Sequence, residues 1–65
     1  MKNSAIKQLI GLKLIKKCDY EKESTEWLNV LIENWLDVAI TKSIETYYFL
    51  QAIEELKTIR ERRAK

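Results

Sequence analysis

The sequence predicts an all-α protein: a short N-terminal helix, a polar loop, and then a long amphipathic helix or helical hairpin, in a small helical bundle completed by dimerisation. Three observations carry this prediction. The chain has no proline, and Gly11 is its only glycine, so the residues that mark turns between strands are missing. Good helix formers dominate the composition. Apolar residues in the second half recur at helical spacing.

The length allows one small domain, residues 1–65. A core of this size contributes only about 3–5 kcal/mol of net stability unless something else stabilises the fold. Cys18 is the only cysteine and there is no histidine, so an intramolecular disulfide and a Cys/His zinc site are both excluded. Oligomerisation is the remaining source of stability, which is one reason to expect a homodimer.

A first helix is expected at residues 4–17, with Asn3 or Ser4 as its N-cap. One broad side of this helix is apolar and carries Ala5, Ile6, Leu9, Ile10 and Leu12. Leu14 and Ile15 lie off that side, and the run LKLIK also fits the two-residue period of a strand. We favour the helix, because a lone strand has no partner in this chain.

Residues 18–24, CDYEKES, read as a polar loop that supplies Asp19 or Ser24 as the cap of the next helix. Beyond the loop, apolar residues fill half of the helical circle: Trp27, Leu28, Leu31, Ile32, Trp35, Leu36, Val38 and Ala39. A surface helix with one neighbour needs an apolar stripe of only about 100°, so this half-cylinder predicts contact with two or more helices.

The run ETYYFL places three aromatic residues side by side, and they cannot all face one core because successive helical residues point about 100° apart. Tyr48 and Phe49 share the apolar side of residues 44–63 with Ala52, Ile53, Leu56 and Ile59. Tyr47 falls on the polar side, where Leu50 follows three residues later. Since aromatic residues are enriched in binding hot spots, Tyr47 and Leu50 are the candidate partner-binding residues.

Residues 25–63 are predicted to be helical, either as one helix or as two helices broken near residues 41–43. A seam with 3-4 spacing continues through them: Leu28, Leu31, Trp35, Val38, Lys42, Glu45, Phe49, Ala52, Leu56, Ile59 and Arg63. Neither a glycine or asparagine nor a capping box marks a turn, so the sequence favours one helix of about 60 Å. Such a helix needs a second copy to cover its apolar stripe, which is the second reason to expect a homodimer.

The residues assigned to the core or the dimer contact are Trp27, Leu28, Leu31, Trp35, Val38, Tyr48, Phe49, Ala52, Leu56 and Ile59. The charges are unevenly distributed: residues 1–17 carry +5, residues 18–56 carry −7 and residues 57–65 carry +4. Basic ends predict an alternative, nucleic-acid-binding function that would use Lys13, Lys16, Lys17, Arg60, Arg62 and Arg63. The same arginines also suit the exposed carbonyls at a helix C-terminus.

The composition offers few of the residues that catalytic or metal-binding sites use. Without histidine or a glycine-rich phosphate loop, we expect no enzyme, no cofactor and no metal. Glu33 and Asp37 share a helix face and could hold a hard cation with help from a second chain, but a solvated acidic face is the preferred interpretation. Cys18 lies beside Lys16 and Lys17, which favours a reactive thiol, yet an incidental small residue explains it more simply.

The expected location is the cytoplasm, because Lys7 and Lys13 interrupt the first apolar run, no cleavage site or membrane span follows, and the single cysteine suits a reducing compartment. The predicted function is that of a non-catalytic helical interaction protein that binds and modulates a larger protein. The length and the composition are typical of small bacterial, plasmid or phage regulators. After nucleic-acid binding, a membrane-surface peptide is the third alternative, although the N-terminal helix is poorly segregated and lacks aromatic residues.

Overall fold

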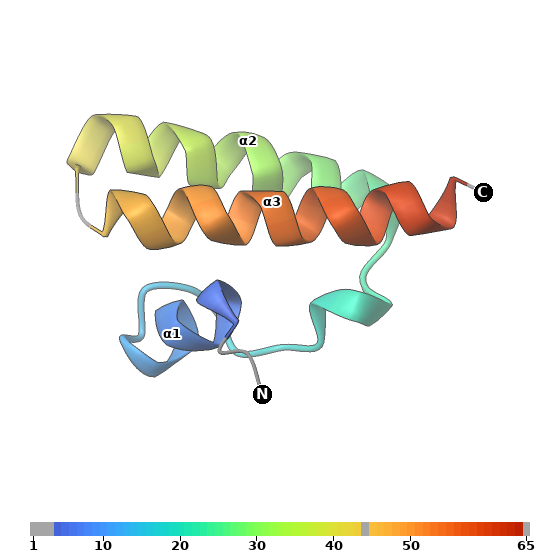
Figure 1. Ribbon diagram of the computed structural model, residues 1–65, viewed down its shortest axis with the longest axis horizontal. Coiled ribbons are helices and arrows are strands. Elements are labelled where there is room, and N and C mark those ends of the chain that lie inside the picture. Colours follow the sequence, from blue (N-terminus) through green and yellow to red (C-terminus); the bar gives the residue numbers. More distant parts are fainter. Residues whose placement is uncertain (1–3, 44, 65) are drawn as a thin grey trace.

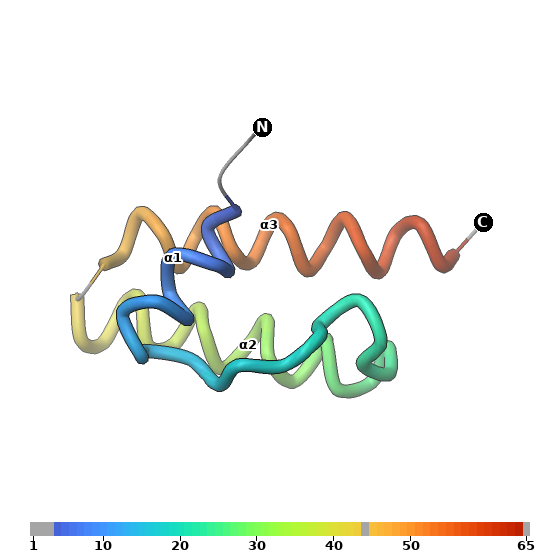
Figure 2. Tube along the Cα trace, turned by 90° about the horizontal axis from the view of Figure 1, so that it is seen from below, coloured from blue at the N-terminus to red at the C-terminus, as the bar shows by residue number. Residues whose placement is uncertain are grey.

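The protein consists of an antiparallel pair of long helices with a short helix packed against one side (Figure 1). The computed structural model describes residues 4–43 and 45–64. In order, the elements are α1 (Ala5–Gly11), a 3-10 turn η1 (Tyr20–Lys22), α2 (Thr25–Lys42) and α3 (Thr46–Arg63). Seen from below, α1 lies across the α2–α3 hairpin and the linker runs on along α2 (Figure 2). The prediction of an all-α fold is confirmed, since the described residues contain no strand.

Helix α1 begins where the sequence predicts but ends six residues early. The side chain of Ser4 is its N-cap and accepts a hydrogen bond from the Ile6 N–H at 3.1 Å; the alternative cap, Asn3, lies outside the described residues. At the other end, the Leu14 N–H donates to the Leu9 carbonyl and the Lys13 N–H to the Ile10 carbonyl. These two bonds form a Schellman motif, which terminates the helix.

The left-handed residue of that motif is Lys13, with φ 63°, at a position where glycine is usual. The predicted helix at 4–17 is therefore wrong beyond residue 11. The physical reason was visible in the pattern, because Leu14 and Ile15 do not share the apolar side of α1 and gain nothing from continuing it.

Of the two alternative caps predicted for the next long helix, Ser24 caps α2, whereas Asp19 caps the preceding turn η1; the linker also supplies one unexpected core residue. The side chain of Asp19 caps η1, and that of Ser24 caps α2 by accepting a hydrogen bond from the Trp27 N–H at 3.1 Å. Tyr20, in a segment predicted to be a polar loop, is only 5% exposed. Its hydroxyl donates to the carbonyl of Lys16 at 2.5 Å, which satisfies the polar end of a buried ring.

The preferred single helix of about 60 Å is wrong, because the chain reverses between α2 and α3. Ser43 and Glu45 both adopt left-handed backbone conformations, with φ 54° and 51°, which cost about 1–2 kcal/mol each for residues other than glycine. Ile44, between them, lies outside the described residues. The Thr46 hydroxyl donates to the Ala39 carbonyl at 3.2 Å and so satisfies a carbonyl in the last turns of α2.

Burial of the apolar stripes explains why the hairpin forms without a glycine. Leu28 and Leu56 are fully buried in the folded hairpin. Each such leucine contributes about 1.5–3 kcal/mol relative to an exposed position. Several buried leucines together outweigh the strain of two turn residues. The strained residues, Ser43 and Glu45, lie at or just beyond the predicted break near 41–43.

The core is centred on Trp35, which packs edge to face between Tyr20 and Phe49, with ring centroids 5.5 and 6.3 Å away. Around these three rings lie the other buried residues: Ala5, Leu9, Leu28, Leu31, Ile32, Ala39, Ala52, Ile53, Leu56 and Ile59. Val38 and Tyr48 are half-buried against this core. Trp27 was assigned to the core or the dimer contact; at 46% exposed, it lies outside the core of the chain, at the edge of the narrower arc that α2 buries.

The hairpin also removes one argument for a dimer. Its two helices cover each other, so no 60 Å stripe is left exposed. The large apolar residues that remain exposed in the described ranges are Leu12, Leu14, Trp27, Val30, Leu36, Ile40, Tyr47 and Leu50. The homodimer stays a prediction.

Candidate functional site

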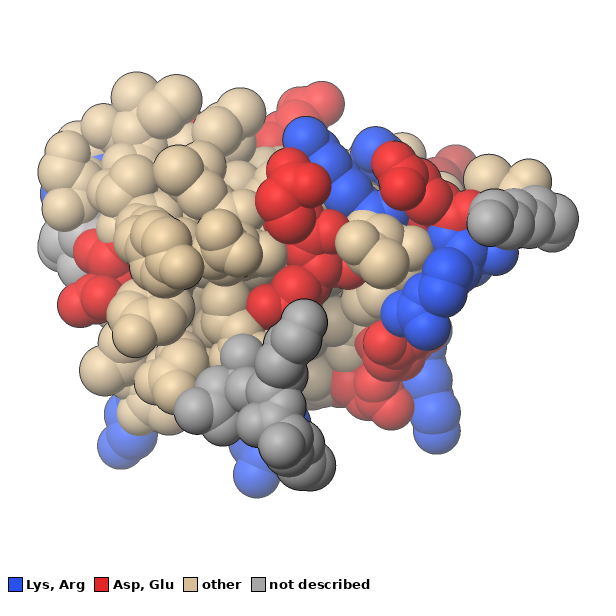
Figure 3. Space-filling view, viewed as in Figure 1, with Lys and Arg blue, Asp and Glu red and all other residues tan. Residues whose placement is uncertain are grey.

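Four exposed apolar side chains gather where α2 and α3 join. Leu36 and Ile40 on α2 are 42% and 70% exposed, and Tyr47 and Leu50 on α3 are 69% and 44% exposed. We call these four residues the hairpin-end face. In Figure 3, uncharged side chains cover most of the half of the molecule on the side of this turn, with acidic and basic groups at its edges, whereas charged side chains crowd the other half.

A hydrogen bond between the two helices shows which of their sides meet. Arg60 Nη1 on α3 donates to Asn29 Oδ1 on α2 at 2.8 Å. Leu36 follows Asn29 by about two turns and Ile40 by about three, so both lie on the same side of α2 as Asn29. Leu50 precedes Arg60 by ten residues, which places it about 80° around α3 from Arg60, toward the exposed side of the helix. The two helices are antiparallel and join at the turn, so the end of α2 and the start of α3 lie side by side there (Figure 1).

The three aromatic residues of the ETYYFL run have three different environments. Phe49 lies in the core, Tyr48 is half-buried at the boundary with α1, and Tyr47 points outward. The Tyr47 and Tyr48 rings meet edge to face, with centroids 5.6 Å apart. They border a hollow of about 550 Å³ between α1 and α3, lined by Ser4, Ala5, Gln8, Tyr47, Tyr48, Gln51 and Glu55. The prediction that Tyr47 and Leu50 face outward is confirmed.

Sequence reasoning found only half of the hairpin-end face. Leu36 was assigned to the apolar half of its helix, and Ile40 was not singled out at all. The available signal was their i, i+4 spacing beside Glu33 and Asp37, which marks an apolar pair among acids. Nothing local indicated that this pair would lie beside Leu50.

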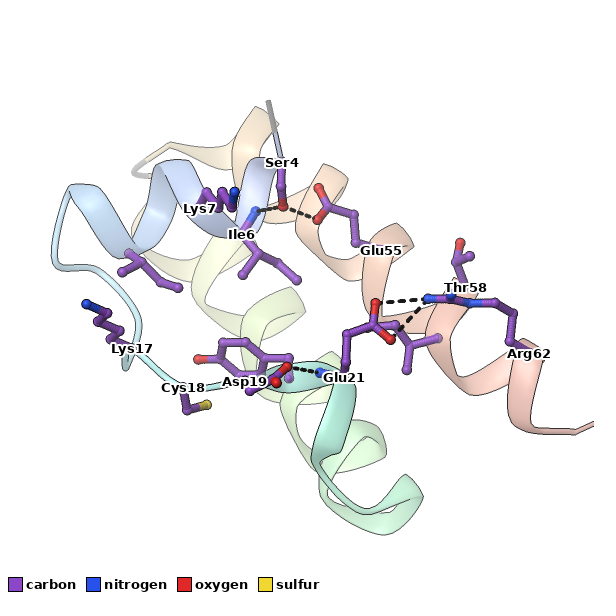
Figure 4. Close-up of a pocket in the computed structure, with 13 residues that line it drawn as sticks. Ser4, Ile6, Lys7, Lys17, Cys18, Asp19, Glu21, Glu55, Thr58 and Arg62 are labelled. Carbon is purple, nitrogen blue, oxygen red and sulfur yellow. Dashed lines mark hydrogen bonds and ion pairs between the residues drawn. The ribbon is translucent and has the colours of Figure 1, made fainter. Parts of the chain in front are cut away.

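A second concave feature lies between α1, the linker and α3 (Figure 4). Its volume is about 930 Å³, within the usual range of small-molecule sites. Its apolar lining consists of Ile6, Ile10, Cys18, Tyr20 and Ile59. A polar bridge lies at each end: the Ser4 hydroxyl and the Ala5 N–H donate to the Glu55 carboxylate, and Arg62 pairs with Glu21 at 3.0 Å.

The charges around this groove balance. Three cations, Lys7, Lys17 and Arg62, face three carboxylates, Asp19, Glu21 and Glu55. The fold therefore brings residues of the two basic ends to one groove, but acids accompany them in equal number. A groove without net charge has no long-range attraction for a phosphate backbone.

The other candidate nucleic-acid-binding residues are dispersed or engaged within the chain. Arg63 Nη2 donates to the Glu21 carbonyl at 2.6 Å, and its Nη1 donates to the Thr25 hydroxyl at 3.4 Å. The C-terminal arginines at 60, 62 and 63 thus tie α3 to the start of the hairpin. Lys13 and Lys16 are exposed in the linker; Lys2 and Lys65 lie outside the described residues.

Among the described titratable groups, Tyr20 shows a clear pKa shift. Burial raises the pKa of the Tyr20 hydroxyl well above its usual value, and neighbouring Cys18 and Glu23 raise it further. Cys18 is half-buried at the groove. Glu33 and Asp37 are exposed, and no group of three potential metal ligands occurs among the described residues.

Comparison with known proteins adds no family. No family model matches the chain, and no curated protein or solved structure matches it. None of the helices in the described ranges combines the length and the apolar character needed to cross a bilayer.

Proposed function

We propose that this protein is a non-catalytic interaction module that binds a larger protein through the hairpin-end face and modulates it. The observation that carries the proposal is that four apolar side chains near the turn are exposed: Leu36 and Ile40 on α2, and Tyr47 and Leu50, one turn apart, on α3. Single exposed apolar residues are ordinary, but a contiguous group is typical of an interaction site.

Placement on regular helices supports this proposal. Leu36 and Leu50 project from the interiors of α2 and α3, Ile40 projects from the last turn of α2, and Tyr47 projects from the first turn of α3. A site presented by packed helices loses little conformational entropy on binding, so more of the contact energy appears as affinity. The exposed tyrosine also suits a hot spot, because its ring buries a large area while its hydroxyl keeps a hydrogen bond.

The test is an alanine scan combined with a binding measurement on a partner captured from the protein's own host. We expect Tyr47→Ala and Leu50→Ala each to change the free energy of unfolding by about 0.5 kcal/mol or less, as exposed positions do. The double variant should weaken partner binding by about 2 kcal/mol or more. Glu61→Ala, at an exposed position about three turns beyond Leu50 along α3, is the matched control and should bind normally. Unchanged binding by the double variant would refute the proposal.

Phe49→Ala and Tyr48→Ala test the orientation of α3 in the same experiment. Phe49 is buried, so its truncation should cost about 3–5 kcal/mol. Tyr48 is half-buried, so Tyr48→Ala should lower the free energy of unfolding less than Phe49→Ala does but more than Tyr47→Ala does. Thermal melts that rank Tyr47→Ala with Phe49→Ala would show that the assigned face is wrong.

Nucleic-acid binding remains the alternative, and the structure suggests how to test it. Replacing the C-terminal arginines would also break their bonds within the chain, so Lys13, Lys16 and Lys17 are the better positions to change. If the alternative is right, the triple Lys→Gln variant should bind DNA or RNA less tightly and with a shallower salt dependence. Absence of binding by the parent protein at about 50 mM salt would eliminate this function.

A homodimer also stays part of the proposal. The exposed residue Trp27 adjoins the buried arc of α2, away from the hairpin-end face. Val30, one turn further along, is also exposed and lies further round the helix toward solvent. We propose them as the contact with a second copy. Sedimentation at low micromolar concentration should then give twice 7.8 kDa, and Trp27→Ser should give the single mass. A parent protein that sediments as a single 7.8 kDa species would refute the dimer.

A further inference from the structure

We infer that the partner segment that fits the hairpin-end face is a basic amphipathic helix. This inference rests on the proposed function and specifies the chemistry of the partner at the same surface. Its evidence is the charge around the face, which the proposed function does not use.

Carboxylates surround the hairpin-end face. On α2, Glu33 precedes Leu36 by three residues, and Asp37 precedes Ile40 by three, so both acids adjoin apolar residues of the face. On α3, Glu54 follows Leu50 by one turn. All three acids are exposed. Figure 3 shows carboxylates at both ends of the uncharged area.

Glu45 adds a fourth exposed acid at the turn. The nearest base on the same side of α3 is Lys57, whose ammonium group lies 3.6 Å from the Glu54 carboxylate. Lys42, although close in sequence, lines a hollow on the other side of α2 with Leu14 and Val38. The described residues around the face therefore carry an excess of negative charge.

The shape of the face suits a helix. Leu36 and Ile40 form a stripe on α2 beside Leu50 on α3, so the apolar strip follows two neighbouring helices near the turn. A partner helix with apolar residues at i, i+3, i+4 and i+7 buries such a strip efficiently. Lysines or arginines flanking its apolar side would face the carboxylates, which favours fast and specific association.

Other occupants suit the same charges poorly. Two copies of this chain paired through the face about a two-fold axis would bring the same acidic border against itself. A nucleic-acid backbone would also meet carboxylates. Charge complementarity therefore favours a partner that is apolar at its centre and basic at its edges.

A direct test uses a model peptide. The probe is a labelled helical peptide of about 18 residues, five turns, with leucines on one side and lysines elsewhere, and its binding is followed by fluorescence anisotropy. The control peptide has glutamate in place of every lysine. The inference predicts that the leucine/lysine peptide binds at low salt and weakens at about 0.5 M salt, and that the leucine/glutamate peptide does not bind.

Paired variants locate the binding. The double variant Ile40→Ser, Leu50→Ser should bind the leucine/lysine peptide about tenfold less tightly, or weaker still. Glu33→Gln with Asp37→Asn should weaken it about threefold or more and reduce its salt dependence. The matched control, Glu26→Gln with Glu61→Gln, removes the same net charge from exposed positions far from the face and should bind as the parent does. Circular dichroism melts exclude loss of folding as the cause.

Several results would overturn the inference: equal binding of both peptides, equal effects of the two carboxylate pairs, or undiminished binding by the serine variant. It also fails if the protein alone forms a dimer that Leu50→Ser dissociates, because a second copy would then occupy the face. If Tyr47→Ala with Leu50→Ala disrupts the natural partner while the leucine/lysine peptide never binds, the proposed function survives and the basic-helix chemistry is refuted.

Discussion

Glu55 on α3 accepts a hydrogen bond from the backbone N–H of Ala5, fifty residues earlier in the chain, with 2.7 Å between Ala5 N and Glu55 Oε2. The other oxygen of the same carboxylate accepts from the Ser4 hydroxyl. A carboxylate is favourable at this place, because first-turn amides lack partners within the helix. Helix α1 has only seven residues, too few to be stable alone, so its helicity depends on contacts such as this one and the buried Leu9.

Glu55→Ala should therefore destabilise the protein by about 1–3 kcal/mol, because it leaves a half-buried hydroxyl and amide without their acceptor. Urea unfolding measures the change, and amide exchange at Leu9 should accelerate more than exchange at Leu56. Glu54→Ala, next in sequence but exposed, is the control and should stay within about 0.5 kcal/mol. Equal effects of the two variants would show that the hydrogen bonds from Ser4 and Ala5 to Glu55 do not stabilise the fold.

A glycine substitution in the turn between the long helices should change stability in opposite directions for a hairpin and for one continuous helix. Ser43 has φ 54°, so Ser43→Gly should stabilise a hairpin by about 1 kcal/mol. In one continuous helix the same change would destabilise by several tenths of a kcal/mol. Asn34→Gly, at an exposed position inside α2, should destabilise in either case and calibrates the measurement. Thermal melts of these two variants distinguish the hairpin from the single helix.

At the end of α1, a lysine occupies a position that suits glycine, and a glycine occupies a position that suits alanine. Lys13 has φ 63°, so Lys13→Gly should stabilise by about 1 kcal/mol. Gly11 lies in the helix, and a Cβ at this position would meet nothing within 4 Å, so Gly11→Ala should add about 0.5–1 kcal/mol. The expected result is a higher midpoint in urea for each variant and for their combination. A lower midpoint for Lys13→Gly would mean that the helix continues past residue 11.

Tyr20 predicts a loss of stability at alkaline pH. Burial raises the pKa of its hydroxyl above the value of about 10 for an unfolded tyrosine, so the folded state favours the neutral form. This contribution is present in full below pH 10 and is lost as the pH rises further. Tyr20→Phe removes the hydrogen bond to the Lys16 carbonyl and should cost about 1 kcal/mol at pH 7. Between pH 9 and 11, however, its free energy of unfolding should fall less than that of the parent. Parallel pH profiles would refute the role of Tyr20.

Local patterns in the sequence determined the orientation of many side chains within the long helices, although Trp27 and Leu36, at the margins of the predicted apolar half, are exposed. Tyr47 faces outward, Phe49 faces inward and Ser24 caps α2, as helical periodicity and capping chemistry predict. These properties depend on neighbours three or four residues away. They hold whether or not the rest of the fold is known.

Only the tertiary structure decided how these helices meet. The apolar seam keeps the same spacing in one long helix and in a hairpin, so periodicity alone could not choose between them. The hairpin is favoured by contacts between residues far apart in sequence, such as Trp35 with Phe49 and Asn29 with Arg60. The same folding places Tyr20 in the core and brings Leu36 and Ile40 beside Leu50. Burial of apolar area is non-directional and has no local signature, so residues that belong to one surface need not reveal it in the sequence.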